Sequence, residues 1–327
     1  MLAEFIEALE KTQFTGEPEP WLVEKTNQFF ESQETGSKPP QELIDGLKSL
    51  PIHGAAWLGI LFGSMVEQGC DVSVTGTAMW EAFVLRMQEF PATTEDETAA
   101  GEPVVPELSP EQVANAEAFA PLCQGLVAHL ARMPELVEKL SGDAEVLQRI
   151  GFLENYSHCF MWVHEVLSRR SGTLLIIHAE SARVQKFRYK NVSNCFHLFS
   201  LLQCAIGKKL PGGQHPKAAI AKAAKGEAYS ESADRAWWHF GIPSPKPDIA
   251  QMVFGEASVD SIPTVTGPDG VSEQVMVLWP TILKERSWGS GFFGPTIEAS
   301  KPSVEMVEEL AKDVAKQWID SVGIAKT

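Results

Sequence analysis

The chain has 327 residues, 44% hydrophobic and 21% charged, and is long enough for one large domain or two coupled domains with a substantial core. Its formal net charge of -16 lies entirely in the first half: residues 1–171 hold 27 acidic and 10 basic residues, whereas residues 172–327 hold 16 acidic and 17 basic residues. This acidity argues against nucleic-acid binding by the first half, because nucleic-acid phosphates are bound by Lys and Arg. The second half could bind nucleic acid only if its basic residues gather on one surface.

Cysteine usage and the N-terminus indicate the compartment. The five cysteines have no C-x-x-C spacing and an odd total, which is typical of a reducing environment. Residues 1–12 predict a helix with three glutamates where a secretory signal peptide carries basic residues and an unbroken apolar core. Residues 49–66 carry no charge, but their small side chains and the flanking Pro51 and Gly69 favour a central helix of a soluble bundle over a membrane span. We therefore expect a soluble, cytoplasmic protein that does not bind membranes.

Helices are expected throughout the first ninety residues, because Pro, Thr or Gly is repeatedly followed by apolar residues at three- and four-residue spacing. The expected ranges are 20–33, 40–50, 51–67 and 77–90. Four consecutive helices with short connections form a bundle. Residues 91–108 then shift to Thr, Glu, Asp, Ala and Pro, which is typical of a solvated loop.

Further helices complete the bundle up to residue 171. Ser109 and Gln112 stand at capping-box spacing, with a proline at the first turn between them. The expected helices are 109–133, 134–140 and a long one over 143–170. The long helix carries an apolar stripe on one face, which should be core: Phe152, Tyr156, Cys159, Phe160, Val163 and Leu167.

At Gly172 the apolar period changes from that of helices to that of strands. The expected elements are strands 173–178 and 183–192, a helix from Asn194 to Ile206, a short helix 217–225, a hairpin of 261–265 and 273–279 around a Gly-Pro-Asp-Gly turn, and a closing amphipathic helix 303–322. The strand 183–192 alternates apolar with basic residues, so one of its faces should be apolar and the other positive.

The fold class expected from these elements is α+β and predominantly α. An N-terminal helical bundle is followed by a mixed half with a small antiparallel sheet and flanking helices. The expected parts are a bundle (1–90), an acidic Pro- and Thr-rich loop (91–108), long helices that complete the bundle (109–171), and the α+β half (172–327).

The segment 181–226 contains no acidic residue and nine basic ones: Arg183, Lys186, Arg188, Lys190, Lys208, Lys209, Lys217, Lys222 and Lys225. In so acidic a chain, it should face something negative within about 8 Å, the Debye length at physiological salt. The candidates are the acidic half of the chain, a protein partner and a phosphorylated ligand. We expect an external surface, since structural ion pairs usually mix both signs locally, with these anion- or partner-binding residues: Arg188, Lys190, Lys208 and Lys209.

A metal site is the first catalytic candidate. Glu154, His158 and Glu165 would share one face of the long helix, as a carboxylate-and-imidazole site requires. The matching set from a second helix is missing, so a polar packing face with Glu–His contacts is the favoured interpretation. We expect neither a metal nor a cofactor.

Nucleophilic catalysis is the second candidate, through Cys195 and His197 at the start of a predicted helix, where the helix dipole favours a thiolate. Residues two apart on a helix point about 200° apart, so the two side chains cannot meet. A buried Cys and a core or capping His are therefore favoured.

Two glycine-rich segments complete the candidates. Gly207–Gly213 offers two lysines and a turn whose N–H groups could cradle an anion, although it is no Walker A motif and its first glycine fits a helix end. Residues 288–295 alternate glycines with aromatics, either as a binding loop or as a turn whose aromatics fold back onto Trp237 and Trp238. The binding-loop candidates are Trp288, Ser290, Phe292 and Phe293.

No complete catalytic constellation is present: the glycines around Ser290 do not form a G-x-S-x-G elbow, and no dinucleotide fingerprint follows a strand. We therefore predict a non-catalytic interaction or regulatory protein that presents a basic surface to a protein or anionic partner. The alternative is an enzyme acting on a phosphorylated or nucleotide-like small molecule, with Lys208, Lys209 and Arg188 as anion clamps and His197 as acid or base.

Overall fold

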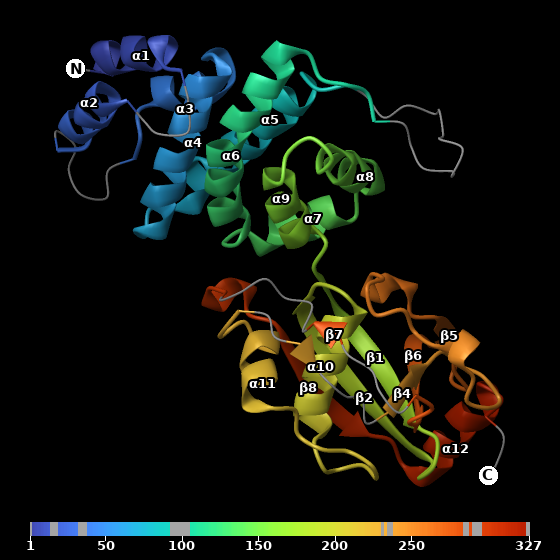
Figure 1. Cartoon of the computed structure of the whole chain (residues 1–327). Coiled ribbons are helices and arrows are strands. Elements are labelled where there is room, and N and C mark those ends of the chain that lie inside the picture. Colours follow the sequence, from blue (N-terminus) through green and yellow to red (C-terminus); the bar gives the residue numbers. More distant parts are fainter. Residues whose placement is uncertain are drawn as a thin grey trace. The chain divides into compact units, whose positions relative to one another are not determined.

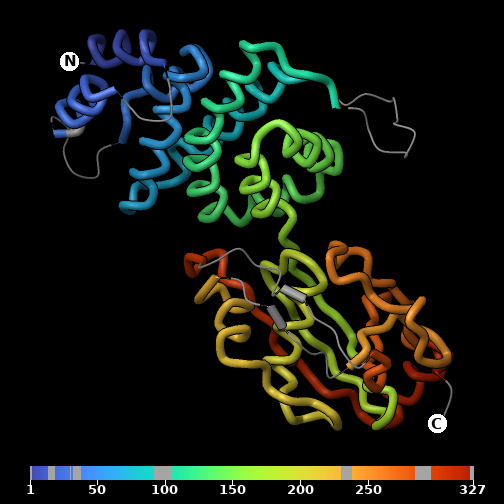
Figure 2. Tube along the Cα trace, viewed as in Figure 1, coloured from blue at the N-terminus to red at the C-terminus, as the bar shows by residue number. Residues whose placement is uncertain are grey.

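The computed structural model (Figure 1) describes residues 2–13, 19–31, 38–91, 105–229, 232–233, 238–283, 288–289 and 296–324. The chain divides into two compact units, Met1–Leu167 and Ser168–Thr327. Each unit is one continuous stretch of chain (Figure 2). Helices form the first unit, and a mixed sheet with helices on both faces forms the second, so the predicted α+β, predominantly α fold class is confirmed.

The described residues of the first unit are helical almost throughout. The helices are α1 (Leu2–Lys11), α2 (Pro20–Glu31), α3 (Gln41–Ser49), α4 (Ile52–Glu67), the 3-10 helix η1 (Val72–Val74), α5 (Gly76–Met87), α6 (Pro110–Leu130), α7 (Pro134–Ser141), α8 (Ala144–Leu153) and α9 (Cys159–Leu167). The predicted capping box opens α6: the Gln112 N–H donates to Ser109 Oγ at 3.2 Å, and the Ser109 N–H donates to Gln112 Oε1 at 3.0 Å. The acidic loop expected over 91–108 falls largely on residues 92–104, outside the described residues.

The charge-free run forms α4, which packs against α6 through glycines. A Cβ on Gly125 would lie 2.0 Å from the Gly59 carbonyl oxygen, and one on Gly63 would lie 2.7 Å from Gly125 Cα. The two backbones are therefore in direct contact, which only glycine permits here. Among the described helices, none is both long enough and apolar enough to cross a membrane.

The long helix predicted over 143–170 is wrong, because the structure breaks it into α8 and α9. Past Leu153 the chain turns, and the Asn155 side-chain amide donates to the Phe152 carbonyl at 2.7 Å, competing with a continued helical ladder. The break preserves the predicted core stripe, of which only Tyr156 is half-buried. It also lets His164 Nδ1 reach Glu154 Oε1 at 2.5 Å.

The second unit carries the sheet. Its elements are β1 (Arg170–His178), β2 (Arg183–Val192), α10 (Cys195–Ile206), α11 (Ala218–Ala224), β3 (Ser232–Ala233), β4 (Trp238–Gly241), η2 (Ile249–Gln251), η3 (Val259–Ser261), β5 (Thr264–Thr266), β6 (Ser272–Pro280), β7 (Trp288–Gly289), η4 (Glu298–Ser300), β8 (Ser303–Glu309) and α12 (Lys312–Ser321). The strand order is β4-β6-β1-β2-β8, with β5 paired to β6. The predicted hairpins β1–β2 and β5–β6 are present, and the sheet is mixed rather than antiparallel because β6 runs parallel to β1.

The closing helix predicted over 303–322 is also wrong in its first half. Residues Ser303–Glu309 form the edge strand β8, which pairs antiparallel with β2, and only Lys312–Ser321 is helical. Val304 packs against the core, whereas Val307 is 46% exposed. Three-residue spacing of valines fits a helix locally, but pairing with the distant strand β2 overrides it.

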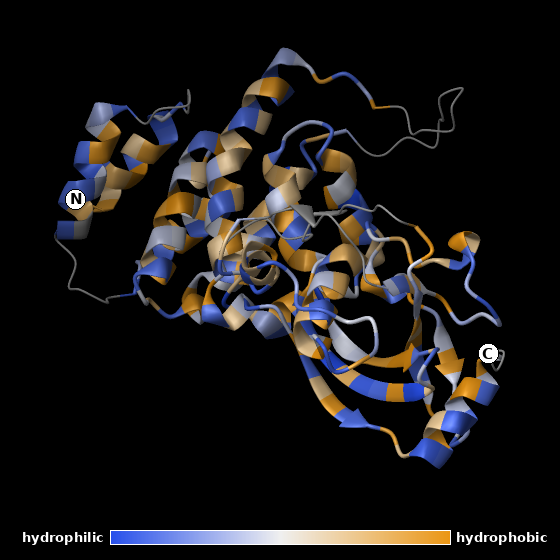
Figure 3. Cartoon of the chain, turned by 60° about the horizontal axis from the view of Figure 1, so that its bottom comes forward, coloured by the Kyte–Doolittle hydropathy of each residue, from blue (hydrophilic) through white to orange (hydrophobic). Residues whose placement is uncertain are grey.

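Alternation along the strands separates two cores, and hydrophilic and hydrophobic bands alternate along them in Figure 3. Leu174, Ile176 and Phe187 face the core shared with α10 and α11. Leu175 and Ile177 face the core covered by α12. The sheet therefore has an α10 face and an α12 face, and the residues of β2 alternate between these faces from Arg183 to Lys190.

Candidate anion-binding surface

Helix α10 is fixed at its start by polar contacts that leave no open N-terminus. The predicted cap is present: Asn194 Oδ1 accepts from the His197 N–H at 2.9 Å. The Cys195 and Phe196 N–H groups donate to the carbonyls of Ala257 (3.0 Å) and Gly255 (2.7 Å). These first N–H groups already have acceptors, so an anion has no place at this helix end.

His197 and Cys195 are buried and contact backbone groups, in agreement with the prediction of a buried Cys and a core or capping His. His197 is fully buried, accepts from the Ser193 N–H at 3.2 Å through Nδ1, and donates from Nε2 to the Ala224 carbonyl at 2.7 Å. Burial lowers the pKa of His197 to about 4, and burial raises the pKa of Cys195 to about 12. The imidazole ties α10 to α11, and neither group is poised to take or lose a proton near neutral pH.

The turn Gly207–Gly213 follows α10 and is held by its own backbone. The Gly207, Lys209 and Gly213 N–H groups donate to carbonyls of Gln203, Ile206 and Leu210, at distances of 2.9, 3.0 and 3.1 Å. These three N–H groups therefore already have acceptors in α10 and in the turn, and they are not available to the anion cradle considered above. Any anion here would be held by the lysine side chains.

The turn is also fastened to the sheet. The Pro211 carbonyl accepts from Trp238 Nε1 and from His178 Nε2, each at 3.1 Å. Arg183 Nη1 donates to the Lys209 carbonyl at 2.7 Å. Lys208 and Lys209 therefore project from a rigid support at the β1–β2 hairpin end of the sheet.

Two of the nine basic residues are neutralised within the unit. Arg183 makes a bidentate pair with Glu309 of β8, and its guanidinium holds the pKa of that carboxyl at about 2. Lys186 pairs with Glu273 of β6. Part of the basic segment is thus internal, paired with acids that are remote in sequence.

The four predicted site residues form two separate pairs. Arg188 and Lys190 are exposed and share the α12 face of β2 with Lys186. On that face Glu305 stands opposite Arg188 in register and Glu308 opposite Lys186, so the signs are mixed. Lys208 and Lys209 follow α10 on the opposite face, at the Arg183 end of β2. Five residues of strand, about 17 Å, separate Arg183 from Arg188, so the two pairs cannot grip one small ligand.

Two further lysines of the segment 181–226, Lys222 and Lys225, lie on and directly after α11. Lys225 follows α11 and lies close enough to Cys204 of α10 to lower that thiol's pKa against the raising effect of burial. Lys222 stands one turn earlier on α11 and is exposed. Lys208 and Lys209 follow the end of α10, whereas Lys225 lies nearer the start of α10, because the Ala224 carbonyl beside it accepts from His197 of the first turn. We call the exposed side chains that follow α10 and that lie on and directly after α11 the lysine surface: Lys208, Lys209, Lys222 and Lys225.

Acids flank the lysine surface. Glu309 pairs with Arg183 and Glu227 with Lys301 at 4.0 Å. Glu180 in the β1–β2 turn is exposed and lies close to His178, whose ring donates to the Pro211 carbonyl. Within the described residues, none of the four lysines forms an ion pair, and only Lys209 has a hydrogen bond, from Nζ to the Ala205 carbonyl at 3.3 Å. The acid-free run was the sequence signal for this surface; the convergence of α10 and α11 was not visible locally.

The remaining candidates do not form a site. Glu154 pairs with His164, and in the described part of the chain no three His, Cys, Asp or Glu side chains are placed to share a metal ion. Trp288 lies in the short strand β7, and its partner strand β3 covers Ser232–Ala233. The other loop candidates lie outside the described residues: Ser290, Phe292 and Phe293.

Comparison of the chain with protein-family models, with curated proteins and with solved structures finds no match.

Proposed function

We propose that the protein is a non-catalytic, cytoplasmic interaction or regulatory protein whose lysine surface binds an acidic segment of a partner protein. The observation that carries the proposal is the lysine surface along α10 and α11, where four exposed lysines lack an ion pair among the described residues. Such a surface attracts negative partners and accelerates their association. The scattered free cysteines accord with a reducing compartment.

The shape of the surface favours an extended acidic segment over a small phosphorylated molecule. Its lysines lie in the turn after α10, on α11 and directly after α11, whereas small ligands are usually held in concave sites. Two cavities in the described part of the chain, of about 450 and 90 Å³, are lined only by residues of the helical unit. For the enzyme alternative, His197 is sealed and Arg188 projects from the other face of the sheet, so the residues it needs do not meet.

The test compares two charge reversals of equal size. The variant Lys208→Glu with Lys209→Glu alters the lysine surface, and the control Arg188→Glu with Lys190→Glu alters the α12 face of the same unit. Binding of a fluorescein-labelled glutamate-rich peptide is measured by anisotropy at low salt. Exposed charge pairs contribute about 0.2–1 kcal/mol each, so we expect the first variant to lose roughly tenfold or more in affinity and the control to stay within about twofold.

The Lys208/Lys209 variant should melt like the wild type, because exposed charges contribute little to stability. The control should melt slightly lower, because its Arg188→Glu change places a second carboxylate opposite Glu305. Equal losses in the two variants would mean that only net charge matters and would reject the surface. A separate thermal-shift panel of nucleotides and sugar phosphates tests the alternative: stabilisation at micromolar ligand that is lost in the Lys208/Lys209 variant would favour the enzyme.

A further inference from the structure

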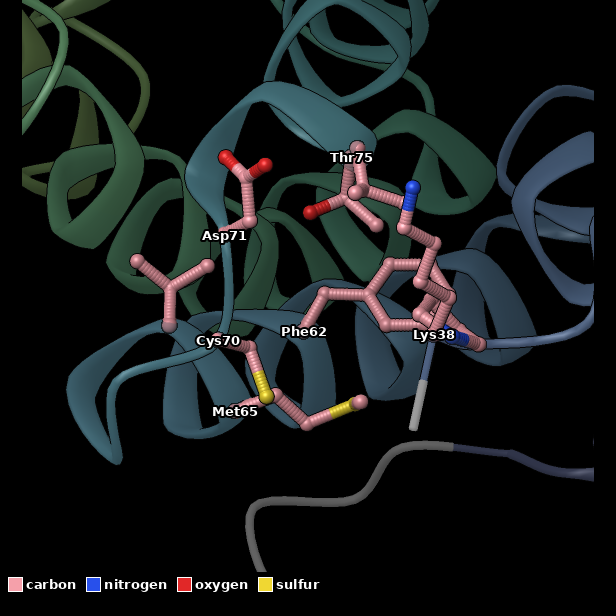
Figure 4. Close-up of a pocket in the computed structure, with 9 residues that line it drawn as sticks. Lys38, Phe62, Met65, Cys70, Asp71 and Thr75 are labelled. Atoms are coloured by element: carbon pink, nitrogen blue, oxygen red, sulfur yellow. The ribbon is translucent and has the colours of Figure 1, made fainter. Parts of the chain in front are cut away.

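A cavity in the helical unit is independent of the lysine surface and has the chemistry of a small-ligand site (Figure 4). It lies where the end of α4, the loop before η1, the start of α5 and the residues preceding α3 meet, and its volume is about 90 Å³. The lining residues are Lys38, Pro39, Phe62, Met65, Val66, Cys70, Asp71, Val74 and Thr75.

The size and the walls of the cavity limit what it can hold. A water molecule takes about 30 Å³ of liquid volume, so the cavity of about 90 Å³ has room for about three water molecules or for one short side chain. Phe62 and Val66 are almost completely buried, and Met65 and Val74 are half-buried. These walls suit a short aliphatic group, because they cannot satisfy a polar one.

The Thr75 hydroxyl oxygen is a hydrogen-bond acceptor for the cavity, because its hydrogen is donated to His129. His129 is fully buried, and its Nδ1 lies 2.7 Å from the Gly125 carbonyl oxygen, which can only accept. The hydrogen of the ring is therefore on Nδ1, and burial lowers the pKa of His129, which keeps the ring neutral. Nε2 is then a lone pair, so the Thr75 hydroxyl, 2.8 Å away, must donate to it. Only the lone pairs of the Thr75 oxygen remain for a ligand.

Opposite charges stand at the rim. The Asp71 carboxylate accepts from the Ser73 N–H at 2.9 Å, and this bond, together with the nearby Lys38 ammonium, lowers the pKa of Asp71. Within the described residues Lys38 and Asp71 form no ion pair, so more than 4 Å separates their charged atoms. In Figure 4 the Thr75 hydroxyl points to the Asp71 side of the cavity. One side of the rim thus offers two acceptors, and Lys38 supplies a donor.

We propose that this cavity binds a small α-amino acid with a short aliphatic side chain. The ligand ammonium would meet the Asp71 carboxylate and the Thr75 oxygen, and the ligand carboxylate would meet Lys38. The side chain would lie against Phe62 and Val66. A zwitterion satisfies both rim charges at once, which neither a simple amine nor a simple acid does.

The test is isothermal titration of the whole chain with L-alanine, with propionate and ethylamine as ligands that lack one charge and L-leucine as one that exceeds the cavity. For six non-hydrogen atoms, we expect a Kd on the order of 0.1–1 mM for alanine and at least tenfold weaker binding of the other three. Failure of alanine to bind below about 10 mM, or propionate, ethylamine or leucine binding as well as alanine, would overturn the proposal.

Variants separate a binding role from a folding role. Asp71→Asn keeps an oxygen for the Ser73 N–H, and Thr75→Ser keeps the hydroxyl. We expect Asp71→Asn to weaken alanine binding at least tenfold, Thr75→Ser to retain it and Thr75→Val to lose it. Lys139→Met, at an exposed position on α7, is the matched control for Lys38→Met and should leave binding unchanged. Unaltered binding in Asp71→Asn would refute the assignment whatever the melting temperature.

Discussion

The buried His197 makes the stability of the second unit depend on pH. Its ordinary pKa is near 6.5, and burial lowers the folded value to about 4. Above pH 6.5 the ring is neutral in both states and contributes no pH dependence. Between pH 6.5 and 4 the unfolded chain binds a proton that the folded chain does not, so the free energy of unfolding falls as pH falls. The whole difference corresponds to about 3 kcal/mol, and below pH 4 no further change arises from this group.

The perturbation is His197→Gln, which cannot titrate. Glutamine can donate to the Ala224 carbonyl and accept from the Ser193 N–H, but not with the geometry of the imidazole. We expect it to cost about 1–3 kcal/mol at pH 8. Because only the wild type carries the titrating ring at position 197, the stability advantage of the wild type should shrink by about 3 kcal/mol between pH 8 and pH 4 and so reach zero or change sign. His129 and His178, whose pKa values burial also lowers, titrate in both proteins and cancel in the comparison.

The assay is urea unfolding at pH 8, 7, 6, 5 and 4, followed by tryptophan fluorescence. Hydrogen–deuterium exchange in peptides from α10 reports opening of the second unit separately from the helical unit. Parallel pH profiles for the wild type and the variant would refute the reasoning. They would also reopen an acid–base role for His197, since a catalytic base needs a pKa near the working pH.

Two further predictions test the edge of the sheet. Glu309→Gln should lower the free energy of unfolding by about 1 kcal/mol at pH 7, a value discounted because the carboxylate is 39% exposed. The carboxylate makes this contribution above its ordinary pKa of 4.5 and loses it as pH falls towards about 2. The unfolding free energies of the variant and the wild type, measured across this pH range, should therefore converge. Val304→Asp should destabilise by about 1–3 kcal/mol and Val307→Asp by less than about 0.5 kcal/mol, as measured by denaturant unfolding; similar losses at both positions would favour a helix over strand β8.

The sequence predicts correctly those features that depend on residues close to one another in the chain. The capping box at Ser109, the Asn194 cap and the Gly-Pro-Asp-Gly turn each depend on residues within a few positions of one another, and all three are present. The hairpin β1–β2 belongs to the same class, since its strands are joined by four residues. Such features follow from backbone and side-chain chemistry at short range.

The predicted elements were wrong where residues distant in sequence determine the secondary structure. Val304 and Val307 fit a helical stripe until β2, more than a hundred residues earlier, offers a pairing edge. The helix predicted over 143–170 keeps its stripe but breaks near Asn155, where a side chain takes over a backbone carbonyl. The alanine-sized cavity is formed by four segments between Lys38 and Thr75, and His129 behind it comes from α6. No short-range pattern predicts such a convergence.

Charged residues in the second unit are distributed unevenly between the faces of its sheet. The net charge of residues 172–327, which is close to zero, therefore does not predict where the basic residues are exposed. Residues of one parity on β2 meet acids of β6 and β8: Lys186 pairs with Glu273, and Arg188 stands opposite Glu305. At the β1–β2 hairpin end of the sheet, Arg183 forms an ion pair with Glu309. These contacts account for acids and bases that cancel in the total, whereas the lysines that follow α10 and those on and after α11 form no ion pair among the described residues. Added salt should therefore weaken partner binding at the lysine surface more than it weakens the sheet, because exposed charges are screened more strongly than partly buried pairs.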